Sequence, residues 1–103
     1  MDFWQVVDGR YSVRSFDATV DVPPETVQRI LQAAVRSPSA GNRQPWHFYV
    51  VRDPAVRQAL AAAAYGQEFV AQAPVAIVVC ADPEQSAERY GQRGRDLYCL
   101  QDT

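Results

Sequence analysis

The sequence lacks lysine altogether and has little histidine, cysteine or methionine. Its 103 residues include one His, two Cys and one Met, and all 10 basic residues are arginine. The two cysteines show no CxxC or Cys/His spacing, which argues against a zinc site and against a disulfide scaffold. Cys80 lies within the apolar run 75–80 and is expected to be a packed, unreactive thiol. We therefore expect a protein without a metal site, in reducing surroundings.

Long apolar runs and a strong net charge are also missing. Residues 1–5 do not have the basic region and apolar stretch of a signal peptide, and no segment reaches membrane-spanning length. A formal net charge of -2 gives no electric field that would hold nucleic acid or an anionic membrane. The sequence therefore predicts a cytoplasmic protein that binds neither.

What is present is the composition of one small globular domain. Hydrophobic residues make up 48% of the chain and charged residues 21%, values that argue against disorder. A chain of 103 residues is long enough for one domain with a core and too short for two. We expect a single unit over residues 1–103.

Local signals predict two helices in the first third of the chain. Asp2 can cap a short helix that ends at Gly9. Pro23 and Pro24 suit the start of a second helix. Its apolar positions follow at helical spacing: Val27, Ile30, Leu31, Ala34 and Val35. This helix should stop near residues 37–38, because the residue before a proline is pushed out of the helical region.

The remaining sequence alternates between strands and helices. Residues 47–52 are typical of a strand. Asp53 caps an alanine-rich helix that follows. The continuous apolar run 75–80 predicts a second strand, buried on both faces. Residues 83–95 are polar and favour a mobile helix–loop stretch, and residues 96–103 match the first turns of another helix.

One candidate binding motif follows the first helix. Arg10, Ser12 and Arg14 alternate, so an extended backbone would place their side chains on one side. Two guanidinium groups around a hydroxyl suit a phosphate dianion, because charge-assisted bidentate hydrogen bonds to phosphate are strong. The alternative is a solvated basic edge. On spacing alone that alternative is favoured, since isolated short motifs give many false positives.

A second candidate is the connector at residues 37–46, which is longer than most helix-to-strand connections. Ser39, Asn42 and Gln44 can each donate and accept hydrogen bonds, as the edge of a planar heteroaromatic ring requires. The alternative is an ordinary connector, and the unusual length modestly favours a functional loop.

The aromatic residues after this connector give weaker signals. Trp46 and Phe48 are expected in a core or an interface. His47 begins a strand, and nothing in the sequence places a carboxylate beside it. We therefore do not expect it to act as a general base.

Taken together and in this order, the motifs resemble those of the nitroreductase (flavoreductase) family. Residues 10–16, Arg-Tyr-Ser-Val-Arg-Ser-Phe, are similar to the family's Arg-Arg-Ser-x-Arg-x-Phe opening, with Tyr11 in place of the second Arg. Residues 37–48 are similar to its Ala-Pro-Ser-x-x-Asn-x-Gln-Pro-Trp loop, which is the most specific match. Residues 69–79 resemble its helix-to-strand passage. Only residues 83–95 have no counterpart.

The resemblance implies an α/β (α+β) fold with a mixed sheet flanked by helices. It also implies a homodimer with FMN at the interface. Members of this family extend beyond the length of this chain, so we expect it to be the N-terminal part of a single FMN-binding domain. The implied activity is hydride transfer from NAD(P)H through the flavin to a small electrophile such as a nitroaromatic or quinone. The alternative is a non-catalytic dimerisation or binding domain that kept the scaffold and lost its flavin site.

The resemblance assigns cofactor-binding residues by position and assigns no catalytic side chain. The phosphate and the pyrimidine side of the flavin would be held by Arg10, Tyr11, Ser12 and Arg14. The same FMN would be contacted from the partner subunit by Pro38, Ser39, Ala40 and Asn42, with Gln44 nearby. Gln67 would offer a polar contact to the flavin ring.

Overall fold

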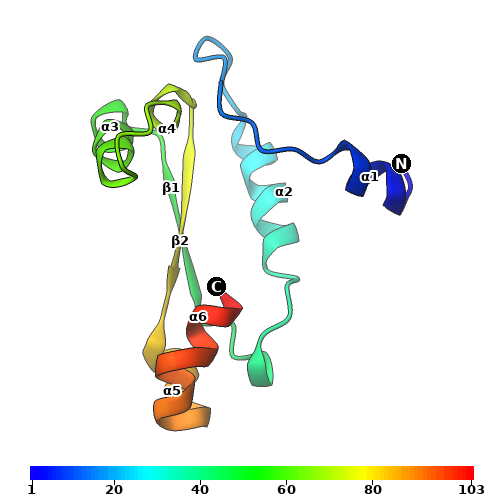
Figure 1. Ribbon diagram of the computed structural model, residues 1–103, viewed down its shortest axis with the longest axis vertical. Coiled ribbons are helices and arrows are strands. Elements are labelled where there is room, and N and C mark those ends of the chain that lie inside the picture. Colours follow the sequence, from blue (N-terminus) through cyan, green and yellow to red (C-terminus); the bar gives the residue numbers. More distant parts are fainter.

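The computed structural model describes residues Met1–Thr103. Its helices are arranged around a ribbon of two strands (Figure 1). In chain order the elements are α1 (Phe3–Gly9), α2 (Pro24–Ala34), β1 (Trp46–Val51), α3 (Pro54–Ala63), α4 (Phe69–Gln72), β2 (Ala76–Ala81), α5 (Pro83–Arg93) and α6 (Cys99–Asp102). A 3-10 turn, η1 (Ala40–Asn42), precedes β1, and a π-helical turn, η2 (Gly94–Tyr98), joins α5 to α6. No helix is both long and apolar enough to cross a membrane.

Capping side chains explain where several helices begin. Asp2 accepts a hydrogen bond from the backbone of Gln5, whose side chain bonds back to Asp2, so α1 starts with a capping box. Asp53 accepts from the backbone of Ala55 at the start of α3. Asp82 does the same for α5. The helices predicted after Asp2, Pro23 and Asp53 are confirmed, because each depends on a local signal.

The ribbon organises the molecule. β1 and β2 run antiparallel, with Trp46 opposite Ala81 and Val51 opposite Ala76. Figure 1 shows α3 and α4 at one end of this ribbon and α5 and α6 at the other. Helices and a small antiparallel sheet together confirm the predicted α+β class.

Hydrogen bonds connect the start of α2 to the end of β1, and the other end of α2 borders a cavity. Just before α2, Asp21 accepts a hydrogen bond of 2.9 Å from Arg52, which follows β1. The same guanidinium donates to the carbonyl oxygen of Val22 at 2.8 Å. At the other end, a cavity of about 150 Å³ lies between the end of α2 and the ribbon. It is lined by Ala34, Ser37, Trp46, Phe48, Val79, Asp102 and Thr103.

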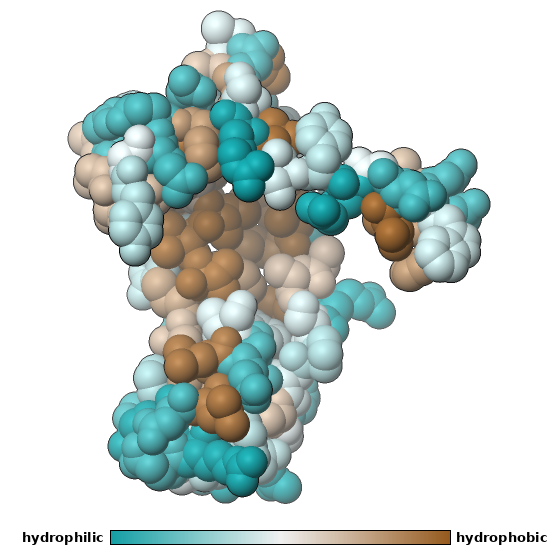
Figure 2. Space-filling model, viewed as in Figure 1, coloured by the Kyte–Doolittle hydropathy of each residue, from teal (hydrophilic) through white to brown (hydrophobic).

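Packing is sparse for a chain of this size. The accessible surface is 7619 Å², about a third more than the roughly 5,800 Å² expected of a compact 11.5 kDa protein. The radius of gyration is 16.1 Å, against about 13 Å for a compact domain. Figure 2 shows apolar side chains exposed across the middle of the molecule, between two polar ends. Large apolar faces are therefore left uncovered within one chain.

Two expectations about the second half of the chain are wrong. Residues 75–80 are not buried on both faces: β2 is half-buried, and Val79 is 44% exposed. The reason is that a ribbon of two strands has no helical layer over each face. Residues 83–95 are not a helix–loop stretch, because α5 extends to Arg93 and η2 follows directly. The helix kinks at Gly91, whose φ of 58° and ψ of -138° favour glycine.

Candidate functional site

The opening motif is an exposed segment with free side-chain donors. Residues 10–14 are exposed and lie outside any helix or strand. The side chains of Arg10 and Ser12 make no hydrogen bond within the chain, and Arg14 makes one, to the carbonyl oxygen of Ser12 at 3.4 Å. Guanidinium and hydroxyl donors left without protein acceptors fit the chemistry of a phosphate group.

An aromatic contact places Gln67 at the same end of the molecule as this motif. The rings of Phe16 and Phe69 lie 6.3 Å apart, which joins the chain after the motif to α4. Gln67 comes just before α4 and donates to the carbonyl oxygen of Ala64 at 2.8 Å. Its exposed side chain also has a carbonyl oxygen free to accept.

The loop between α2 and β1 has an unusual backbone. Gly41, Asn42 and Gln44 adopt left-handed φ values of 59°, 53° and 52°. For a residue other than glycine this conformation costs roughly 1–2 kcal/mol, although asparagine tolerates it better than glutamine. The hydroxyl oxygen of Ser39 accepts a hydrogen bond from the backbone of Gln44 at 3.0 Å and so closes the loop. The amide side chains of Asn42 and Gln44 are exposed and without partners.

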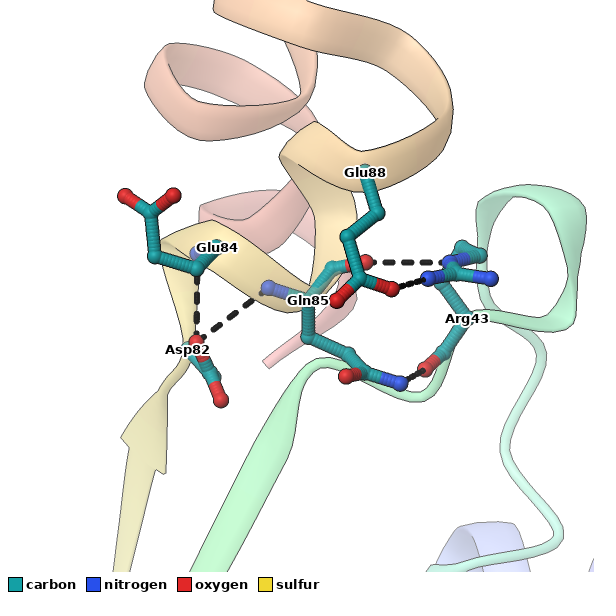
Figure 3. Close-up of polar contacts among 5 residues, drawn as sticks. All are labelled: Arg43, Asp82, Glu84, Gln85 and Glu88. Carbon is teal, nitrogen blue, oxygen red and sulfur yellow. Dashed lines mark hydrogen bonds and ion pairs between the residues drawn. The ribbon is translucent and has the colours of Figure 1, made fainter.

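Residues distant in sequence anchor this loop. The backbone N–H of Ala40 donates to the carboxylate of Asp102 at 3.0 Å. Arg43 and Gln85 exchange two hydrogen bonds, and Arg43 forms an ion pair with Glu88 (Figure 3). Sequence reasoning missed these anchors, because 42 to 62 positions separate the partners and no local pattern links them.

His47 has a carboxylate neighbour that was not expected. Its Nε2 atom lies 2.9 Å from Oδ2 of Asp82, a carboxylate that nothing in the sequence places there. The pair forms because Trp46 lies opposite Ala81, which places the start of β1 beside the residue that follows β2. Hydrogen bonds from His47 and from the backbone of Gln85 and Glu84 hold the pKa of Asp82 below its ordinary value of 3.8. Asp82 thus caps α5 as a carboxylate.

One chain does not bring all the predicted residues together. The segment between α1 and α2, which carries the opening motif, and α4, which Gln67 precedes, lie near one end of α2, and the loop between α2 and β1 lies beyond the other end (Figure 1). α2 has 11 residues, which at 1.5 Å per residue makes it about 16 Å long. A ligand that contacts both groups within one chain would have to span at least that distance.

Comparison with known protein families shows to which family the chain belongs. The nitroreductase family matches residues 7–100, which is nearly the entire chain. The chain belongs to the nitroreductase family. An oxygen-insensitive NADPH nitroreductase of Helicobacter pylori is 30% identical over 95 residues, covering 91% of this chain and 45% of that protein. An NADH dehydrogenase of Thermus thermophilus is 52% identical over 65 residues, covering 63% of this chain and 32% of that protein.

Solved structures of the family share the fold. A nitroreductase-like protein of Streptococcus mutans superimposes with a TM-score of 0.75 at 28% identity, covering 97% of this chain and 53% of that one. A candidate nitroreductase of Exiguobacterium sibiricum, solved in complex with FMN, gives 0.73 at 28% identity, covering 99% and 52%. The chain thus spans 32% and 45% of the lengths of these two curated relatives and about half of the two solved structures.

Proposed function

We propose that residues 1–103 form the N-terminal part of a single FMN-binding domain. The enzyme would be an NAD(P)H-dependent oxidoreductase that reduces a small electrophile such as a nitroaromatic or quinone. The observation that carries the proposal is the exposed donor set of Arg10, Ser12 and Arg14, in which the one hydrogen bond within the chain is that from Arg14 to the carbonyl oxygen of Ser12. It occurs in a chain whose family includes a structure solved with FMN.

The chemistry of the donors fits the parts of FMN. Arg10 and Arg14 provide positive charge and forked N–H donors for the phosphate, and Tyr11 and Ser12 provide hydroxyl groups between them. Bound FMN would supply the hydride chemistry, and the protein would supply binding, orientation and charge.

The loop offers a second set of contacts. Asn42 and Gln44 expose amide groups that can pair with the polar edge of the flavin ring, and Gln67 offers one more amide. Pro38, Ser39 and Ala40 shape the loop from which Asn42 projects. Ser39 does so through its bond to the backbone of Gln44.

We propose further that two copies of the chain assemble around the flavin. The opening motif and the loop between α2 and β1 lie at opposite ends of α2 (Figure 1). The opening motif of one subunit and this loop of its partner would therefore contact the same flavin. Exposed apolar residues support association, since monomers seldom leave large contiguous apolar patches uncovered. On α1 these include Phe3, Trp4, Val6 and Val7.

Flavin spectroscopy tests the proposal. The purified protein titrated with FMN should show a shifted flavin absorbance band, bleached by NADH or NADPH under nitrogen and restored by adding a nitroaromatic. A protein that is colourless once unbound FMN has been removed would overturn the assignment. A stable dimer without flavin would favour the non-catalytic alternative.

A further inference from the structure

The side chain of Arg43 points away from the surface that its neighbours form. Asn42 and Gln44 are exposed, but the Arg43 side chain is only 26% exposed and reaches back to α5. In Figure 3 it extends toward Gln85 and Glu88. Arg43 is therefore an inward anchor between two outward-facing amides.

The contact between Arg43 and Gln85 is reciprocal. Nε of Arg43 donates to the backbone carbonyl of Gln85 at 3.0 Å, and Nε2 of Gln85 donates to the backbone carbonyl of Arg43 at 3.1 Å. Each side chain thus fixes the main chain of the other. Glu88, one helical turn later, neutralises the arginine.

The helical side of this contact is itself held in place. Gln85 lies in the first turn of α5, and its backbone N–H donates to Asp82 at 3.2 Å. The backbone of Asp82 donates in turn to the carbonyl oxygen of Pro45 at 2.7 Å, just before β1. Arg43 is therefore connected through α5 to the ribbon.

The loop needs such support because its left-handed backbone conformation is unfavourable in free energy. Asn42 and Gln44 keep left-handed φ values only where the surroundings impose them. α5 also packs closely on the loop: a β-carbon at Gly41 would lie 2.5 Å from the hydroxyl oxygen of Tyr90 and 2.9 Å from a side-chain carbon of Arg89.

We infer that Arg43 and Gln85 are positioning residues for flavin binding. They hold the loop in the conformation that presents Asn42 and Gln44, and they do not touch the ligand themselves. This inference rests on the flavin-binding function proposed above. It assigns a role to the segment of α5, for which the sequence motifs give none.

The test uses two methionine variants and a matched control. Arg43→Met removes the forked donor, and Gln85→Met removes the amide while keeping the α5 backbone. Arg95→Met is the control, because it breaks another ion pair of α5, Arg95 with Glu84 at 2.9 Å, without touching the loop. Each full-length variant is titrated with FMN. Hydrogen exchange of residues 39–44 is measured without flavin.

We expect Arg43→Met and Gln85→Met to weaken FMN binding roughly tenfold. Exchange at the amides of Ala40 and Gln44 should rise by a similar factor, since these N–H groups donate to the Asp102 carboxylate and to the Ser39 hydroxyl while the loop keeps its shape. Arg95→Met should change neither. Arg43→Lys keeps the charge but loses the planar fork, so it should restore the affinity only in part.

The possible failures can be told apart. Equal FMN affinity and equal loop exchange in all variants would overturn the positioning role and leave the flavin function intact. No FMN binding by the unmodified protein would overturn the proposed function and this inference together. If Arg43→Met fails to fold, Gln85→Met and Arg43→Lys decide the question by the same two measurements.

Discussion

The backbone at Gly94 lies against the carbonyl group of Ser86, so that a β-carbon at position 94 would come 2.6 Å from that oxygen. Backbone atoms cannot move aside as a flexible side chain can. We expect Gly94→Ala to lower the free energy of unfolding by about 1–3 kcal/mol, measured by chemical denaturation. Gly9→Ala is the control, because a β-carbon at position 9 would have no neighbouring atom within 4 Å. Equal stability of both variants would show that this approach does not constrain the fold.

The phosphate assignment predicts a loss of affinity without a loss of stability. Arg10→Ala should weaken FMN binding by roughly 1.5–3 kcal/mol, because it removes a charge-assisted contact. The melting temperature of the flavin-free protein should stay the same, since Arg10 is exposed and makes no side-chain bond. Arg29 is an exposed arginine on α2, so Arg29→Ala should leave both the FMN affinity and the melting temperature unchanged. An apoprotein that unfolds in Arg10→Ala with flavin affinity intact would make Arg10 structural.

Replacing Asn42 tests backbone strain and flavin recognition separately. Asn42→Gly relieves the left-handed conformation and should leave the stability of the apoprotein equal or slightly higher. The same change removes the amide, so FMN affinity should fall by about 0.5–1.5 kcal/mol. Parallel thermal melts and flavin titrations measure the two effects. Unchanged affinity would remove Asn42 from the site.

The lowered pKa of Asp82 predicts a pH-dependent contribution to stability. A carboxyl whose pKa is depressed on folding stabilises the protein above its unfolded value near 3.8, and this contribution is lost as the pH falls through the folded value. Asp82→Asn should therefore be less stable than the unmodified protein at neutral pH. The two should converge in acid. Asp8→Asn, at an exposed aspartate without a side-chain hydrogen bond, is the control in denaturation experiments across this range.

The open packing predicts association. A chain with an accessible surface of 7619 Å² should not behave as a compact, flavin-loaded monomer. Size-exclusion chromatography with light scattering should show a dimer or larger species, and near-UV circular dichroism should report ordered aromatics in it. A compact monomer with a sharp cooperative melt would contradict this prediction.

The elements that the sequence predicts well are those with local signals. Asp2, Asp53 and the two prolines before α2 mark helix starts by bonds and torsions confined to a few residues. The motifs at residues 10–16 and 37–48 together indicate the family for a similar reason, since their residues and spacing can be compared directly. Their role in flavin binding stays a prediction.

What the sequence does not predict depends on pairing between distant segments. The bonds of Arg43 with Gln85 and of His47 with Asp82 join positions 42 and 35 residues apart. They arise only once β1 and β2 are in register. The exposure of β2 also differs from the prediction, because an apolar run indicates what a strand can bury and not which neighbours are present.

The ribbon has a further consequence for how this chain folds. Both of its faces are largely apolar, so alternation of side chains gives little energetic preference for one register over a slip by one residue. The polar bonds of Asp82 with Pro45 and His47 can form in only one alignment. Asp82 therefore specifies the register of the two strands: its hydrogen bonds stabilise the correct pairing and would be absent from a ribbon shifted by one residue.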